Sequence, residues 1–180
     1  MPNYLYVDNS NVWIEGMHVA AVKSGLAPNL SAALDGNICD HSYKIDFGRL
    51  FQFAGGAKAE VGRAVLFGSR PPPNDSLWVS AKAKGFEVVV FDRNVKNREK
   101  KIDTSIVTEM VTDSFQLMNA KKDEITLVAG DGDYVPAIDS LRSRGFVFHV
   151  VFWGHASGAL KAATTKFINL NSYFEHLKKK

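Results

Sequence analysis

A chain of 180 residues has the length of one domain, and its 46% hydrophobic and 23% charged residues exclude the disordered and fibrous classes. The single cysteine, Cys39, cannot form an internal disulfide, which fits a reducing compartment. No apolar run reaches 18 residues, and no basic leader precedes an apolar stretch. We therefore expect a cytoplasmic protein with no signal peptide and no membrane partner.

Short apolar runs and helical patterns alternate along the chain. The runs predict strands at residues 4–7, 64–67, 86–91, 125–129 and 146–153, with a shorter sixth strand at 167–170. Helices are predicted to begin near Val12 and to span 46–53, 74–84, 103–120 and 133–144, while the three final lysines resemble a frayed helix end. Residues 16–45, of mixed composition, form a long insertion.

This alternation predicts the fold class. Strands that are apolar on both faces are typical of a parallel sheet covered by helices on either side. We expect a single α/β domain over residues 1–180, built as a three-layer α/β/α sandwich. Its central sheet should be mostly parallel, in the Rossmann-like order 3-2-1-4-5.

Acidic residues follow the predicted strands. Asp8 comes directly after the first strand, and Asp131 and Asp133 follow the fourth. Ligands of such sheets bind at the carboxyl ends of the strands, where the strand order reverses. Strands 1 and 4 are neighbours at that point in the predicted order, so the three carboxylates should face one another.

A fourth carboxylate, Asp103, begins the long helix that leads to strand 4. Its spacing of four residues places it on one stripe with Val107 and Val111. We expect this stripe, which continues through Phe115 and Met118, to face the core and to turn Asp103 inward. Glu109 lies about 120° away on the same helix and is therefore less suited to join the cluster.

Carboxylates that share a cleft repel one another unless a cation is bound between them. Oxygen ligands suit Mg²⁺ or Mn²⁺, and such sites perform phosphoryl chemistry. The histidines show no zinc-binding spacing, and no GxxxxGK[ST] motif is present. Plainer interpretations also exist. Asp103 and Asp133 could each cap a helix, and residues 8–11 could form only a turn. In that turn, Asn11 either caps the next helix or positions a water or phosphate.

Three motifs in order carry a family resemblance: YLYVDNSN, KKIDTSIVTEM and LVAGDGDYVPAIDSLRSRGFVFHVVFWG. Together they resemble an NYN domain of the PIN-like nuclease superfamily. The resemblance implies a PIN-like α/β/α fold, an acidic cluster that binds Mg²⁺ or Mn²⁺, and cleavage of RNA. It assigns the cluster to Asp8, Asp103, Asp131 and Asp133. Asn11 matches the polar residue after the first aspartate, and Glu109 a second acidic position. Ala129 departs from the family, in which many members have Ser or Thr.

A basic segment borders the predicted cleft. Residues 93–101 carry five basic side chains and one acidic, and they join strand 3 to the Asp103 helix. The side chains that we expect to hold RNA phosphates are Arg70, Arg93, Lys96, Lys100 and Lys101. The segment could equally be a solvated connection. Trp13 either stacks a base or packs under the first helix, and Trp153 and His155 either line the rim or belong to the core and surface.

We therefore expect a metal-dependent ribonuclease whose partner is single-stranded RNA. Asp8, Asp103, Asp131 and Asp133 are the predicted catalytic and metal-binding residues, and Asn11 is a predicted substrate contact. A non-catalytic RNA-binding or regulatory module is the alternative, motivated by Ala129. A phosphatase of small phosphoesters is a weaker third. The sequence leaves the oligomeric state open, a homo-oligomer included.

Overall fold

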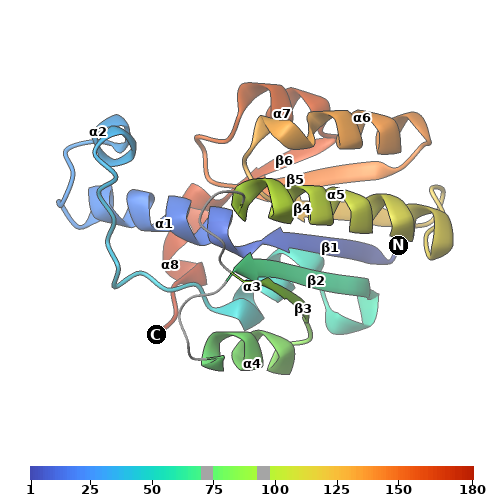
Figure 1. Cartoon of the computed structure of the whole chain (residues 1–180), viewed down its shortest axis with the longest axis horizontal. Coiled ribbons are helices and arrows are strands. Elements are labelled where there is room, and N and C mark those ends of the chain that lie inside the picture. The colour runs from blue at the N-terminus through green and yellow to red at the C-terminus, as the bar shows by residue number, and fades with distance from the viewer. Residues whose placement is uncertain (70–74, 93–97) are drawn as a thin grey trace.

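The computed structural model of the chain describes residues 1–69, 75–92 and 98–180, without the side chains of 98–100. One sheet in the order β3-β2-β1-β4-β5-β6, with every pair parallel, forms its centre (Figure 1). The strands are β1 (Asn3–Asp8), β2 (Val61–Ser69), β3 (Glu87–Phe91), β4 (Glu124–Val128), β5 (Val147–Phe152) and β6 (Lys166–Asn169). The predicted order is therefore confirmed, and the sixth strand extends it at the β5 edge.

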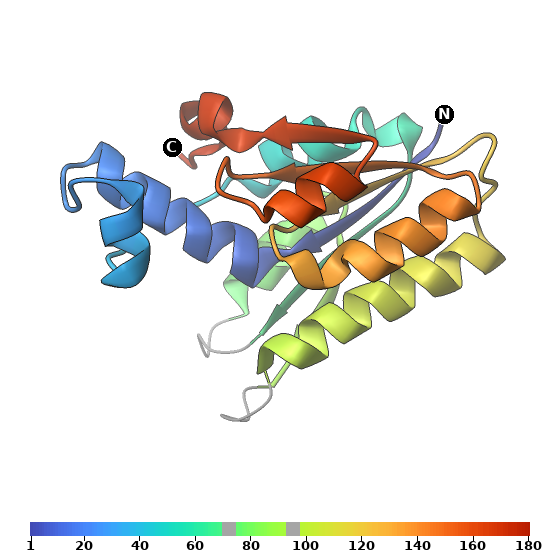
Figure 2. The same ribbon diagram turned by 90° about the horizontal axis from the view of Figure 1, so that it is seen from above.

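Helices cover both faces of the sheet (Figures 1 and 2). They are α1 (Asn9–Lys23), α2 (Leu30–Asp35), α3 (Phe47–Gly55), α4 (Ser76–Ala83), α5 (Arg98–Gln116), α6 (Val135–Ser143), α7 (Gly158–Ala163) and α8 (Phe174–Leu177). One face carries α5 and α6 side by side, with α7 next to α6; the other carries α3, with α4 and α8 beside it. The predicted α/β/α layers are confirmed.

The central strands are buried on both faces because their sequences are apolar at successive positions. In β1, Leu5, Tyr6 and Val7 are fully buried, and β4 buries Leu127 and Val128 to the same extent. Such strands cannot alternate between core and solvent, so helices must cover both sides. The residue pair Val7–Val128 is in register, which brings the carboxyl ends of β1 and β4 to the same edge.

The first helix starts earlier than predicted and ends inside the expected insertion. Asp8, rather than Asn11, is its N-cap: the Asp8 carboxylate accepts a hydrogen bond from the Asn11 backbone N–H at 3.0 Å. The helix therefore begins at Asn9 and not near Val12. It continues away from the end of β1, and α2 lies alongside it (Figure 1). Residues 16–45 thus contain most of α1 and all of α2.

The core stripe of α5 differs from the predicted one by a rotation of one position. Ile102, Ile106 and Met110 are its buried apolar residues, whereas Val107 and Val111 are half-buried. The predicted stripe residue Phe115 is 71% exposed, and its ring packs 3.7 Å beneath the Arg144 guanidinium. The prediction for Phe115 was wrong because helical periodicity does not show where a helix leaves the sheet.

The C-terminal residues pair with the segment before α3 and are not a frayed helix end. Helix α8 ends at Leu177, and Lys178 forms an antiparallel bridge with Ile45. The Lys179 N–H then donates to the Lys44 carbonyl at 2.8 Å. Among the helices in the described part of the chain, none is long and apolar enough to cross a membrane.

Candidate metal and nuclease site

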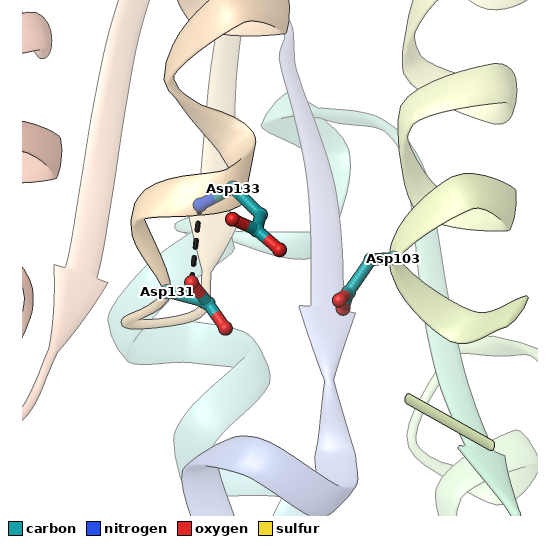
Figure 3. Close-up of side chains that lie close together, drawn as sticks. All are labelled: Asp103, Asp131 and Asp133. Carbon is teal, nitrogen blue, oxygen red and sulfur yellow. Dashed lines mark hydrogen bonds between the residues drawn. The ribbon is translucent and has the colours of Figure 1, made fainter. Parts of the chain in front are cut away.

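The acidic residues converge at the carboxyl edge of the sheet. One carboxylate oxygen from each of Asp103, Asp131 and Asp133 lies within 4.8 Å of the others. Figure 3 shows the three side chains turned toward one space near the end of β1, Asp103 from α5 and the other two from the loop after β4. Asp103 meets the two aspartates 28 and 30 positions later because β1 and β4 are neighbours and α5 packs against β1 and the 3₁₀ turn Gly132–Tyr134.

Asp8 lies deeper in the same site. Only 6% of it is exposed, and with Asp103 and Asp131 it lines a cavity of about 170 Å³. Burial is the main cause that raises the pKa of Asp8, to about 7, and the charges of Asp103 and Asp131 raise it further. Hydrogen bonds from the Asn11 N–H and the Tyr134 hydroxyl act in the opposite direction. Without a cation, Asp8 therefore takes up a proton at a much higher pH than an ordinary aspartate does.

Tyr134 is a site residue that the sequence analysis missed. Its side chain is fully buried, and its hydroxyl donates to Asp103 at 2.8 Å, with the Asp8 carboxylate 3.4 Å away. Burial and the two carboxylates raise the pKa of Tyr134 far above its ordinary value, so the hydroxyl keeps its proton. The signal was present in the sequence: a tyrosine directly after GDGD must find a partner for its hydroxyl when it is buried.

The loop after β4 is held by two contacts. Asp131 accepts from the Asp133 N–H at 3.0 Å and so caps the short 3₁₀ turn Gly132–Tyr134. The Asn11 side-chain carbonyl accepts from the Gly130 N–H at 2.9 Å. Asn11 thus ties the start of α1 to the loop that carries the two exposed aspartates, and it also lines the cavity. A substrate contact by Asn11 stays a prediction.

The plainer helix-cap interpretations fail for two of the aspartates. Helix α6 begins after Tyr134 and has no side-chain cap, so Asp133 does not serve it. Asp103 lies in the second turn of α5, which begins at Arg98, and is too far along the helix to cap it. The convergence of these carboxylates is therefore not explained by local helix chemistry.

Glu15 is a second residue that the sequence analysis missed. It lies on α1 and lines the same cavity, and its carboxylate is 2.6 Å from Nε2 of His155. His155 is thereby fixed beside the site, and its buried Nδ1 has no hydrogen-bond partner among the residues that the structure describes. Nothing in the local sequence around residue 15 marks it, because His155 approaches from the loop after β5, 140 residues away.

Glu109 and Trp153, which the sequence analysis considered for the site, lie outside the acidic cavity. Glu109 forms an ion pair with Arg63 at 2.7 Å and does not line the cavity, as the helical-wheel argument expected. Trp153 is fully buried, and its indole N–H donates to the Val12 carbonyl at 2.8 Å, so it belongs to the core and not to the rim. Ala129, which lacks the hydroxyl expected at this position, is fully buried.

The structure describes only one of the five side chains that we predicted to hold RNA phosphates. Arg70, Arg93 and Lys96 lie outside the described residues, and so does the side chain of Lys100. Lys101 is exposed, but it lines a hollow on the β3 side of α5, whereas Ile102 and Asp103 line the acidic cavity. A contact between these side chains and RNA remains a prediction.

Comparisons with known proteins identify the family of this chain. The NYN domain model matches residues 30–171, a range that includes Asp103, Asp131 and Asp133. No curated protein matches the chain. The fold is similar to the crystal structure of a protein of unknown function from Vibrio parahaemolyticus, with a TM-score of 0.67 at 16% identity over 94% of this chain and 92% of that one. The chain therefore belongs to the NYN family, a branch of the PIN-like nuclease superfamily.

Proposed function

We propose that this protein is a metal-dependent ribonuclease that hydrolyses phosphodiester bonds of single-stranded RNA. The observation that carries the proposal is the convergence of Asp103, Asp131 and Asp133 within 4.8 Å, beside the buried Asp8. Membership of a nuclease-like family supports it. Three carboxylates this close together are costly without a cation, and oxygen donors fit Mg²⁺ or Mn²⁺.

Asp103, Asp131 and Asp133 are the residues that would hold the cation, with Asp8 behind them. A bound Mg²⁺ or Mn²⁺ supplies an activated water and neutralises charge on the phosphate that is attacked. The remaining contacts keep the carboxylates in place. Tyr134 retains its proton and orients Asp103, while Asn11 fixes the loop that carries Asp131.

Cleavage of a labelled single-stranded RNA by the purified protein tests the proposal. We expect cleavage in Mn²⁺ or Mg²⁺ and none in chelator. Asp131→Asn should lower the rate by about 100-fold or more, because loss of a charged ligand weakens the charge stabilisation of the reaction. Asp139→Asn is the matched control, since Asp139 is an exposed aspartate on α6 that does not line the cavity.

Two results would refute the enzymatic proposal. One is cleavage by Asp131→Asn at the wild-type rate in Mn²⁺, which would place the activity elsewhere. The other is binding of RNA without cleavage under every metal condition, which would favour a non-catalytic RNA-binding module. Circular dichroism of each variant shows whether the fold is retained.

A further inference from the structure

A second pocket, of about 480 Å³, lies between α1, α3 and α4. Its volume falls within the range of about 300–1,000 Å³ that is typical of ligand sites. Asn9 and Trp13 line it from α1, whereas Ser10, Asn11 and Glu15 of the same helix turns line the acidic cavity. The pocket and the acidic cavity therefore lie on adjoining faces of the N-terminal end of α1. Of two consecutive residues, Asp8 lines the acidic cavity and Asn9 lines the pocket.

Asn9 is a buried amide that faces this pocket. Only 4% of the residue is exposed, and it lines the pocket from the first turn of α1. The amide offers both a donor and an acceptor, which is the pattern that the edge of a nucleobase can satisfy.

The rim of the pocket is basic. Lys44, Lys84 and Lys179 line it, all three are exposed, and none forms an ion pair within the described ranges. Lys179 reaches the pocket because its backbone is bonded to Lys44. The acidic residue of the lining, Asp46, is already engaged as the N-cap of α3, where it accepts from the Arg49 N–H at 3.0 Å. The rim therefore carries a net positive charge that suits phosphate.

Trp13 supplies an aromatic surface to the pocket that Asn9 and the lysines also line. The side chain is half-buried, and its indole N–H donates to the Tyr43 carbonyl at 3.0 Å, which fixes the orientation of the ring. A fixed aromatic ring beside basic side chains is how proteins hold the bases of single-stranded nucleic acid. The ring packs against the core, as one of the two sequence-based interpretations expects, and it also lines the pocket; base stacking by Trp13 stays a prediction.

We propose that this pocket binds one nucleotide of the RNA strand whose neighbouring phosphodiester lies in the acidic cavity. The base lies against Trp13 and Asn9, and its phosphate lies among Lys44, Lys84 and Lys179. The inference rests on the proposed function and names a subsite for its substrate. An acidic peptide shares the charge of the strand but has no base to pair with the amide and the ring.

Kinetics with two substrates tests the subsite. Lys44→Ala/Lys84→Ala should raise the KM for a 12-nucleotide RNA about tenfold or more and leave kcat unchanged. Hydrolysis of bis(p-nitrophenyl) phosphate, which reaches only the acidic cavity, should not change. The salt slope of RNA binding, measured in the Asp131→Asn background, should fall by about 0.7 for each lost phosphate contact. Lys121→Ala/Lys122→Ala is the matched control, because these exposed lysines precede β4 at the opposite edge of the sheet.

Photocrosslinking of a 4-thiouridine 12-mer to the wild type gives a measurement that needs no variant. We expect crosslinks at Trp13 or in the segments around Lys44 and Lys84. An unchanged KM in the double variant, an equal loss on both substrates, or crosslinks confined to other segments would overturn the subsite while RNA cleavage stands. Displacement of RNA by a polyglutamate peptide of equal length and at equal concentration would also overturn it. A wild type that neither binds nor cleaves RNA overturns both proposals.

Discussion

Replacing Asp8 with asparagine should stabilise the metal-free protein, and the gain should grow with pH. The pKa of Asp8 is raised from 3.8 to about 7 in the folded chain. At about 1.36 kcal/mol for each pH unit between these values, folding with an ionised Asp8 costs about 4 kcal/mol above pH 7. Because the folded-state pKa is the higher one, this cost is absent at low pH and rises as the pH passes from about 4 to 7.

The substitution keeps the structural contacts of the side chain. Asparagine caps helices about as well as aspartate, so the bond from the Asn11 N–H survives. Tyr134 still donates to Asp103. We therefore expect Asp8→Asn to raise the free energy of unfolding by about 4 kcal/mol at pH 8.5 and by about 1 kcal/mol at pH 4.5. For a chain of this size, the larger value corresponds to roughly 8–16 °C in Tm.

Urea denaturation in chelator from pH 4.5 to 8.5 measures this difference directly. Asp139→Asn, which changes the same charge on an exposed surface, should follow the wild type at every pH. Mn²⁺ at one hundred times its Kd should stabilise the wild type by about 2.7 kcal/mol and the Asp8→Asn variant by less. A difference that does not vary with pH, or a variant less stable than the wild type at pH 8.5, would refute the reasoning.

Three further substitutions probe the surroundings of the site. Tyr134→Phe removes a hydroxyl that donates to a carboxylate at 2.8 Å, so urea denaturation should show a loss of about 1.5–3 kcal/mol; an unchanged midpoint would mean that the bond is not made. Gly130→Ala would bring a methyl group into steric overlap with the edge of the Phe152 ring and should cost about 1–3 kcal/mol, whereas wild-type stability would show that the loop can shift. Arg63→Met leaves Asp113, which is 3% exposed, without its cation. We expect a loss of about 3–5 kcal/mol in thermal or chemical denaturation, and a loss below 1 kcal/mol would contradict the burial argument.

The sheet and the place of the acidic cluster could be predicted because they depend on simple rules. Apolar runs such as residues 4–7 mark strands that are buried on both faces, and the strand order then determines which carboxyl ends are neighbours. Asp8, Asp131 and Asp133 follow those strands directly, so their positions required no knowledge of side-chain packing. Asp103 was placed correctly although α5 begins five residues earlier than expected.

The residues that were missed or misplaced depend on contacts between distant segments. Glu15 is held by His155 from the loop after β5, and Lys179 reaches the second pocket through a backbone bond to residue 44. Neither contact leaves a local pattern in the sequence. Phe115 was misplaced because periodicity shows which residues share a helix face but not where that face leaves the core.

The position of β1 has a consequence for synthesis of the chain. β1 leaves the ribosome before both of its neighbours in the sheet, β2 and β4, which are completed only at residues 69 and 128. At about 5–20 residues per second, roughly 6–25 s pass between the synthesis of Asp8 and that of Asp133. During that time the apolar β1 segment has an unpaired edge, and the nascent protein lacks part of its acidic cluster. A product truncated before residue 124 would keep this exposed edge without Asp131 and Asp133, so it would lack two of the proposed cation ligands and be prone to aggregate.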